Sequence, residues 1–277
     1  MKTITSRDNP ALKSARKLLT RKGREAEGAF LVEGSKLISE ASSAGFVIER
    51  VFVNAGALVR GEAEAGVFEG EAALEEKLFS ELAKTVSPQP YIAVARQPDP
   101  GAAQPDPGTA QPDPGTALFS GKMRGAGGRV LILDRVSDPG NVGTMIRTAL
   151  ASGMDCVWCV KGTADAFSDK ALRASAGAVF HLPVAAGLSA RECIARARGM
   201  EARLVVCSAG GEDLFEAELT GSIAVVVGSE ATGPQEELLG AADAVVGIPM
   251  AEASESLNAA AAAAVVMYEA LRQSRRS

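Results

Sequence analysis

The chain has 277 residues, of which 47% are apolar and only 4% aromatic, and its net charge is −5. This length favours two domains whose cores are aliphatic. No window approaches the roughly 20 apolar residues of a transmembrane helix, and the N-terminus lacks the apolar centre of a signal peptide. We therefore expect neither a transmembrane helix nor a membrane partner, and we expect a cytoplasmic location.

Metal or histidine chemistry finds little support in the sequence. Cys156 and Cys159 have the spacing of a redox or zinc pair, but they lie in an apolar run that predicts a buried strand. Positions three apart on a strand face opposite sides. No second pair of cysteine and histidine residues completes a zinc site, and His181 is the only histidine. We expect structural cysteines, no metal, and a packing or surface role for His181.

Residues 1–96 alternate between helical and strand patterns. Apolar spacing predicts a first helix from Asn9 to Arg21, with Leu12, Ala15, Leu18 and Leu19 inward. The elements that follow are strands at 29–32, 47–53 and 91–95 and helices at 35–44 and 74–83. This alternation predicts a small α/β domain with a helix-flanked sheet.

Positive charge is concentrated at the start of the chain. Residues 1–24 carry eight basic residues against Asp8 alone, a net charge of +7, so the remainder carries −12. Such asymmetry indicates a basic surface that meets phosphates. The same residues also fit a solvated amphipathic helix, and both interpretations can hold at once.

Residues 97–127 contain a repeat with a period of seven residues. Pro-Asp-Pro-Gly follows Gln97, Gln104 and Gln111 in turn. Proline at this density prevents both helix and strand ladders, so the segment is expected to be an extended or disordered tether. We interpret it as a linker without chemistry of its own.

The second domain begins near Gly128 and repeats strand–loop–helix units. Strands are predicted at 129–133, 156–160, 204–207 and 223–227, with a last strand ending at Ile248. A helix capped by Asn141 is expected to run through Leu150, and another near 169–176. These units imply a mainly parallel sheet, which binds ligands at the carboxyl ends of its strands. The loops at 208–211, 228–233 and 249–258 lie at that edge.

The C-terminal loop precedes an alanine-rich run at 259–264, which predicts a helix. Pro249 stops the last strand, and Ser254 or Ser256 could cap the helix. Neither a G-x-G-x-x-G nor a P-loop motif is present. The loops instead suggest a ligand held largely by backbone groups, with Ser208, Ser256 and Asn258 as polar tips.

Three segments, in this order and spacing, resemble the SpoU (TrmH-like) family of RNA ribose 2′-O-methyltransferases in the SPOUT superfamily. They are Leu133 to Ala149 (LDRVSDPGNVGTMIRTA), Val227 to Gly233 (VGSEATG) and Ile248 to Asn258 (IPMAEASESLN). The Arg173–Gly177 segment is also similar to the family, and the resemblance covers about residues 128–271. The N-terminal domain is similar to the L30e-like substrate-binding domain of the family.

The resemblance implies an α/β fold whose C-terminal domain is a parallel sheet with a trefoil knot. It also implies S-adenosylmethionine as cofactor and a homodimer. The domains would be an L30e-like RNA-binding domain (1–96), the linker (97–127) and a methyltransferase domain (128–277). The expected function is 2′-O-methylation of a ribose in structured RNA, with ribosomal RNA favoured. A tRNA substrate and a non-catalytic RNA-binding protein that retains the fold are the alternatives.

Motif matching also carries roles to individual residues. The catalytic positions are Asn141, Arg147, Glu230, Ser256 and Asn258. The cofactor positions are Ser208, Gly228, Ile248, Met250 and Leu257. The RNA-binding residues expected from charge and resemblance are Arg7, Lys13, Arg16, Lys17, Arg21 and Arg173.

These residue types suit methyl transfer to a hydroxyl. A ribose 2′-OH is a weak nucleophile, so it must be aligned with the methyl group and lose a proton. We hypothesise that Arg147 engages the RNA phosphate and the 2′-OH, either as an unusual base or by positioning the hydroxyl, since arginine is normally protonated. Asn141 and Ser256 could orient the hydroxyl or Arg147, whereas Glu230 would hold loops.

Overall fold

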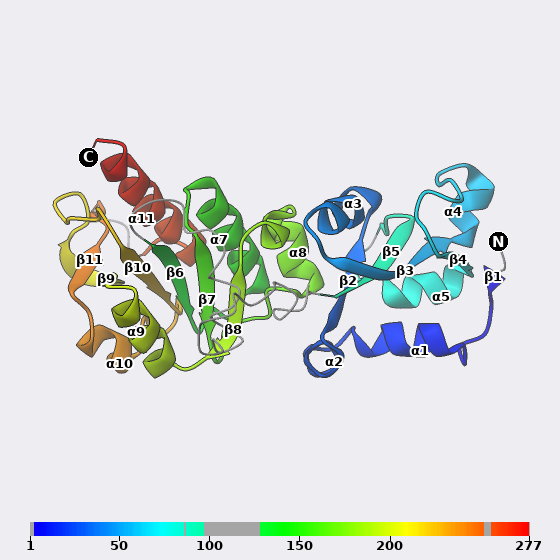
Figure 1. Ribbon diagram of the computed structural model, residues 1–277, viewed down its shortest axis with the longest axis horizontal. Coiled ribbons are helices and arrows are strands. Elements are labelled where there is room, and N and C mark those ends of the chain that lie inside the picture. The colour runs from blue at the N-terminus through cyan, green and yellow to red at the C-terminus, as the bar shows by residue number, and fades with distance from the viewer. Residues whose placement is uncertain (1–2, 86, 97–127, 252–255, 277) are drawn as a thin grey trace, which may run out of the picture. The chain divides into compact units, whose positions relative to one another are not determined.

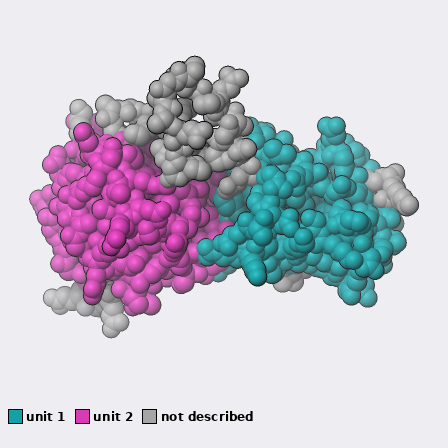
Figure 2. Space-filling view, turned by 60° about the horizontal axis from the view of Figure 1, so that its bottom comes forward, with its two compact units in different colours: residues 1–102, 167–172 teal, residues 103–166, 173–277 magenta. Residues whose placement is uncertain are grey.

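The computed structural model describes residues 3–85, 87–96, 128–251 and 256–276. The chain divides into two compact units, which are coloured separately in Figure 2. Unit 1 consists of Met1–Ala102 with Phe167–Leu172, and unit 2 of Ala103–Ala166 with Arg173–Ser277. The predicted tether and Ser254 lie outside the described residues.

Unit 1 contains a five-stranded sheet in the order β1-β4-β3-β5-β2. Strand β5 runs antiparallel to β3 and β2, whereas β1, β4 and β3 are parallel. The strands are β1 (Thr3–Ile4), β2 (Ala29–Glu33), β3 (Val47–Asn54), β4 (Glu71–Leu74) and β5 (Tyr91–Arg96). The helices are α1 (Pro10–Lys17), α2 (Arg21–Glu27), α3 (Ser35–Ser43), α4 (Ala55–Arg60) and α5 (Glu76–Leu82). The predicted α/β character of this part is confirmed.

The predicted helix from Asn9 to Arg21 is wrong in its extent, because two helices occupy this region. Helix α1 ends at Lys17, and the next amides bond three residues back. Thr20 then starts α2 by accepting the N–H of Gly23, which is how an N-cap residue opens a new helix. Strand β4 and helix α4 were not predicted. Leu74, the first residue of the predicted helix at 74–83, is instead the last residue of β4.

Unit 2 contains a six-stranded sheet in the order β11-β9-β10-β6-β7-β8, in which every neighbouring pair is parallel. Its strands are β6 (Arg129–Asp134), β7 (Cys156–Val160), β8 (Val184–Leu188), β9 (Arg203–Asp213), β10 (Ile223–Gly228) and β11 (Ala244–Gly247). Its helices are α7 (Pro139–Ala151), α8 (Asp169–Ser175, partly in unit 1), η2 (Ala178–Phe180), α9 (Ala190–Gly199), α10 (Glu236–Gly240) and α11 (Ala259–Ser274). The predicted parallel sheet is confirmed, although β8 and α9 were not foreseen.

Helices cover both faces of this sheet, with α7 and α11 on one side and α9 and α10 on the other (Figure 1). Alternate strand residues such as Ile132, Trp158 and Val226 form one core cluster with Cys193 and Leu238 from α9 and α10. Because both faces are covered, the strands read as unbroken apolar runs. Polar side chains therefore collect where the strands end, at the carboxyl edge.

Two predicted details at this edge are corrected. Asp138, not Asn141, caps α7, because the Asp138 carboxylate accepts the N–H of Asn141 at 3.0 Å. Pro139 follows at the first helical position, where a missing N–H costs nothing. Likewise Asn258, not Ser256, caps α11, where its Oδ1 accepts the N–H groups of Ala260 and Ala261.

The predicted loop at 208–211 lies within β9 but outside the ladder with β11. Val245 pairs with Val206, and Val246 pairs next with Glu212, so the intervening residues of β9 bulge from the ladder. A Cβ atom on Gly211 would lie 2.6 Å from the Val245 carbonyl oxygen. The main chains of β9 and β11 thus touch at a point where only glycine fits.

This contact predicts that Gly211→Ala destabilises the protein by about 1–3 kcal/mol, the usual cost of overpacking against a rigid neighbour. Gly199→Ala at the end of α9 is the matched control, since nothing lies within 4 Å of its Cβ position. Urea denaturation measures both free energies of unfolding. Equal stability of the two variants would contradict the close approach.

Candidate active site

Three segments that are distant in the sequence are joined by side-chain hydrogen bonds at the carboxyl edge of unit 2. Asn258, at the start of α11, donates from Nδ2 to Asn141 Oδ1 at 3.2 Å. Asn141, in the first turn of α7, donates in turn from Nδ2 to Glu230 Oε1 in the loop after β10. Three of the predicted catalytic residues therefore contact one another. We call this row, Asn258–Asn141–Glu230, the amide chain.

The amide chain has a defined direction. Asn258 Oδ1 is occupied by the helix amides of α11, so its NH₂ group must point outward. Asn141 consequently presents Oδ1 to Asn258 and its own NH₂ to the Glu230 carboxylate. Reversing either amide would set donors against donors, so the network itself fixes the orientation of both side chains. One hydrogen of the Asn141 NH₂ group remains for a ligand.

Arg147 and Ser256 are not part of the amide chain. Arg147 lies on the same helix as Asn141, about 9 Å further along the axis at about 1.5 Å per residue. Its side chain is exposed, and within the described part of the chain it makes neither a hydrogen bond nor an ion pair. The same holds for the exposed Ser256. Arg147 is thus a cation available to an incoming anion.

The loop after β10 folds tightly onto the end of its strand. Gly233 N donates to Ser229 O at 2.8 Å, which closes a small turn that contains Glu230. A Cβ atom on Gly228 would lie 2.3 Å from Pro234 N, so glycine is required there. The predicted cofactor residue Gly228 therefore lies where the loop main chain folds back onto the end of β10.

The remaining predicted cofactor residues surround the end of β11. Gly247 packs against the Ser208 carbonyl oxygen, which a Cβ atom would approach to 3.2 Å. Beyond Ile248, the apolar side chains of Met250 and Leu257 are 40% and 41% exposed. We call these five predicted positions the cradle: Ser208 in the β9 bulge, Gly228 at the end of β10, and Ile248, Met250 and Leu257 beyond β11, of which Met250 and Leu257 offer accessible apolar surface. Such a surface suits a partly apolar ligand.

Asp134 and Gln235, which were not among the predicted site residues, hold the loop after β10. Asp134 is fully buried at the end of β6, and both of its oxygens accept hydrogen bonds from Gln235. An acidic residue that ends a strand buried on both faces was a usable signal, because a buried carboxylate requires partners. The Asp138-Pro139 pair was likewise a stronger cap signal than Asn141.

Most of the predicted RNA-binding residues of unit 1 are ion-paired. Arg7 and Arg16 both bind Glu81, and Lys13, Lys17 and Arg21 pair with Asp8, Glu27 and Glu25. The hydrogen bond from Arg7 lowers the pKa of Glu81, and the one from Lys17 lowers the pKa of Glu27. Exposed pairs of this kind are weak and can exchange partners with phosphates.

The four cysteines are free thiols, and burial raises the pKa of Cys156, Cys193 and Cys207. Cys156, Cys159 and Cys193 are buried, and burial raises the pKa of Cys193 and of Cys207 to about 12. Such thiols stay protonated at neutral pH. In the described ranges, no cluster of three potential metal ligands occurs, and no helix is long and apolar enough to span a bilayer.

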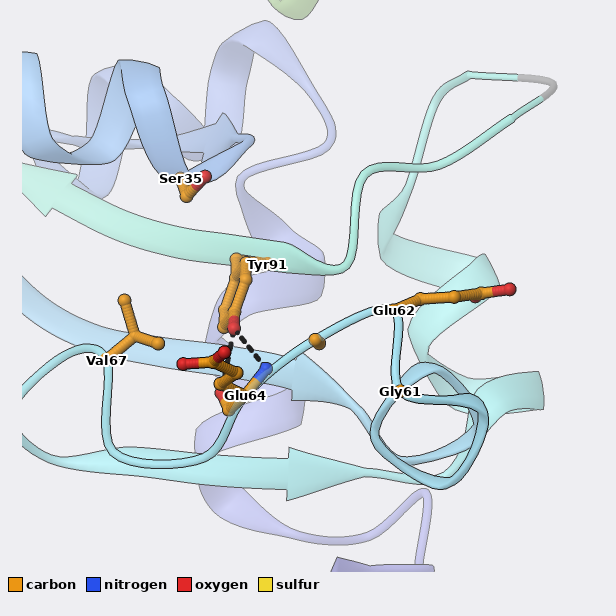
Figure 3. Close-up of a pocket in the computed structure, with 7 residues that line it drawn as sticks. Ser35, Gly61, Glu62, Glu64, Val67 and Tyr91 are labelled. Carbon is orange, nitrogen blue, oxygen red and sulfur yellow. Dashed lines mark hydrogen bonds between the residues drawn. The ribbon is translucent and has the colours of Figure 1, made fainter.

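Unit 1 contains a pocket of about 250 Å³ between the start of α3 and the loop after α4 (Figure 3). The Tyr91 hydroxyl holds this loop by donating to Glu64 O at 2.7 Å and accepting from Glu64 N at 2.9 Å. The lining residues are Ser35, Gly61, Glu62, Ala63, Glu64, Val67 and Tyr91. The two carboxylates disfavour phosphate, so this end of unit 1 is a poor surface for an RNA backbone.

Comparison with known proteins now identifies the class. Residues 128–268, about half of the chain, match the SpoU rRNA Methylase family, and residues 9–93 match the MRM3-like substrate binding domain. A *Bacillus subtilis* relative, 23S rRNA (guanosine(2553)-2′-O)-methyltransferase RlmP, is 34% identical over 97% of this chain and 98% of its own length. The chain therefore belongs to the SpoU rRNA methylase family, which confirms the resemblance inferred from its three motifs.

Solved structures of similar proteins share this fold over nearly the whole chain. The AdoMet-bound rRNA methyltransferase from *Sinorhizobium meliloti* matches with a TM-score of 0.78 and 29% identity, covering 98% of this chain and 97% of that one. AviRb from *Streptomyces viridochromogenes*, also in complex with AdoMet, matches with a TM-score of 0.78 and 28% identity over 97% and 99%. The α/β architecture with an N-terminal domain and a C-terminal methyltransferase domain is thus shared.

Asn258 caps α11 through Oδ1 and donates to Asn141 through Nδ2, so substitutions can remove one contact without the other. Asn258→Ala removes the cap of α11 and should lower the free energy of unfolding by about 1 kcal/mol. Asn258→Asp keeps the cap but turns the donor toward Asn141 into an acceptor, so stability should be retained. Chemical denaturation checks this contrast, and an equally stable alanine variant would contradict the capping role.

Proposed function

We propose that this protein transfers the methyl group of S-adenosylmethionine to the 2′-hydroxyl of a ribose in structured RNA, with ribosomal RNA as substrate. The amide chain carries the proposal, because it gathers Asn141, Glu230 and Asn258 at the start of the helix that also bears Arg147, an exposed cation without an ion-pair partner among the described residues. Relatives named as 23S rRNA 2′-O-methyltransferases support the choice of ribosomal RNA. An enzyme with this substrate would work in the cytoplasm.

The cradle fits the cofactor. Gly228 and Gly247 let main-chain segments pack closely at the strand ends, where a Cβ atom would crowd the neighbouring backbone, and Met250 and Leu257 offer apolar surface. Ser208, Gly228, Ile248, Met250 and Leu257 would hold S-adenosylmethionine, mainly through backbone groups. When bound, this cofactor supplies an electrophilic methyl group on a sulfonium.

The residues around the cradle can prepare the hydroxyl. Arg147 binds the RNA phosphate and draws the neighbouring 2′-OH toward its guanidinium, whose charge stabilises the developing oxyanion while the hydroxyl proton passes to solvent water. Asn141 cannot rotate between Asn258 and Glu230, so its free N–H has a fixed direction in which to orient that oxygen. Glu230 holds Asn141, and Ser256 provides a further hydroxyl at the rim. Alignment of this kind removes much of the entropic barrier to reaction.

We further propose that residues 1–96 bind the RNA. Arg7, Lys13, Arg16, Lys17 and Arg21 would exchange their carboxylate partners for phosphates, which releases counterions as well as Glu81, Glu25 and Glu27. Arg173 in α8 would add a contact nearer the reacting ribose. The acidic pocket beside Tyr91 would face away from the RNA backbone.

We also propose that residues 128–277 form a trefoil knot and that two copies pair. The close passage of β9 and β11, and the packing of α11 against α7 and β10, support threading of the C-terminal segment. Half-exposed Tyr268 on α11, with exposed Leu257 at the entrance to that helix, supports an apolar pairing surface.

Arg147→Ala should lower the rate of methyl transfer at least about 100-fold, because it removes the charge that aligns and activates the hydroxyl. S-adenosylmethionine binding, measured by calorimetry, should be retained. Arg191→Ala is the matched control, since this exposed arginine lies on α9 and pairs only weakly with Glu237 at 3.3 Å. Undiminished transfer by the Arg147 variant would overturn its assignment.

A wild-type protein that binds RNA but not S-adenosylmethionine would instead favour the non-catalytic RNA-binding alternative. Methylation of tRNA in preference to ribosomal RNA would retain the chemistry and change the substrate.

A further inference from the structure

The buried carboxylate of Asp134 accepts hydrogen bonds from Gln235, at the end of the loop that carries Glu230. Asp134 ends β6 and pairs in register with Gly228, the last residue of β10. Its Oδ2 accepts the main-chain N–H of Gln235 at 2.6 Å, and its Oδ1 accepts the side-chain NH₂ of Gln235 at 2.5 Å. Both hydrogen bonds are charge-assisted and reach a fully buried carboxylate from the partly exposed Gln235, which makes them strong.

Arg135 adds a second connection to the same loop. Its Nε lies 3.3 Å from Asp134 Oδ1, and its Nη2 donates to Gly233 O at 3.2 Å. Arg135 adopts a left-handed backbone conformation with a φ of 58°, held by the hydrogen bond from its N–H to Thr163 Oγ1. A non-glycine residue rarely keeps such a conformation unless its surroundings fix it.

These contacts fix the far end of the loop. Gly228 is anchored by the strand ladder, and Gly233 and Gln235 are anchored by Arg135 and Asp134. Glu230 lies between the two anchors, and its carboxylate reaches Asn141. Without the Asp134 anchor, the far end of the loop would keep only the contact from Arg135 to Gly233, and Glu230 would be held less firmly.

We propose that Asp134 is a positioning residue for methyl transfer, acting through Gln235 and Arg135 to hold the 229–235 loop against the cofactor cradle. This inference rests on the function proposed above. Asp134 touches neither the RNA nor the reacting methyl group. Its contribution is to fix the loop main chain beside the cofactor and, through Glu230, the direction of the Asn141 amide.

The test is the nearly isosteric variant Asp134→Asn in the full-length protein. One amide oxygen can still accept the Gln235 N–H, but the new NH₂ group opposes the Gln235 NH₂ and Arg135. We expect the dissociation constant for S-adenosylmethionine to rise about tenfold or more, in line with the loss of a charge-assisted bond. Hydrogen exchange of the 229–235 amides in the free protein should accelerate.

Gln235→Met keeps the main-chain N–H and should produce a smaller increase. Asp243→Asn is the matched control, because that carboxylate also accepts a main-chain N–H, from Leu204 at 2.7 Å, and an arginine, Arg198 at 2.6 Å, at the opposite edge of the sheet. A merely structural role would lower the fraction of folded, active enzyme in both aspartate variants without changing cofactor affinity.

A double variant distinguishes the positioning of Glu230 by Asp134 from an overall loss of stability. If Asp134 acts through Glu230, then Glu230→Gln should slow transfer less in the Asp134→Asn background than in the wild type. Unchanged cofactor affinity and unchanged loop exchange in folded Asp134→Asn would overturn the proposal. Failure of the wild type to bind S-adenosylmethionine would instead refute the proposed function, while the exchange measurement would still report on the loop anchor.

Discussion

The hydrogen-bonded amide chain is the interaction on which the rest of the candidate site depends. It connects Asn258 with Asn141 across 117 residues of sequence, and Asn141 with Glu230 across 89. Neither contact could form without the six-stranded parallel sheet, which brings the ends of β6 and β10 and the start of α11 to one edge. The apolar core therefore serves the chemistry indirectly, since it fixes the register that places three polar side chains within reach.

Each polar group at this edge has a structural partner that limits its freedom. Asp138 caps α7, which leaves the Asn141 side chain available for the network. The oxygen of Asn258 caps α11, which commits its NH₂ group to Asn141. Asp134 satisfies its own buried charge by anchoring the loop of Glu230. Stabilising contacts thus determine the geometry of the candidate site, and Arg147, the one cation proposed to be catalytic, is left exposed.

Much of the fold could be predicted because its strands are buried on both faces. Runs such as Arg129–Leu133 and Ile223–Val227 are continuous and apolar, and both became parallel strands. Elements of only four to six residues, such as β4, β8 and α4, were too short to show a clear period. The division of the first helix at Thr20 depended on one capping bond. Register between strands, which places Asp134 beside Gly228, cannot be read from a single sequence.

The motifs indicated residues that the fold brings together at one edge, but they could not reveal the hydrogen bonds between them. They indicated Asn141, Glu230 and Asn258 correctly as neighbours, because each follows a strand that ends at the same edge. They gave no sign that Asn141 donates to Glu230, or that Asp134 supports the loop behind it. Charge patterning likewise indicated the basic helix of unit 1 without indicating that Arg7 and Arg16 share Glu81. Sequence spacing reports proximity along the chain, whereas these partners come from tertiary contacts.

The most direct measurement of the central claim is a map of 2′-O-methylated nucleotides in ribosomal RNA from cells with and without this gene. The account predicts that one methylated ribose disappears when the gene is absent and returns when the purified protein and S-adenosylmethionine are added to the unmodified RNA. Identical maps, with no transfer by the purified protein to any ribosomal RNA, would contradict it.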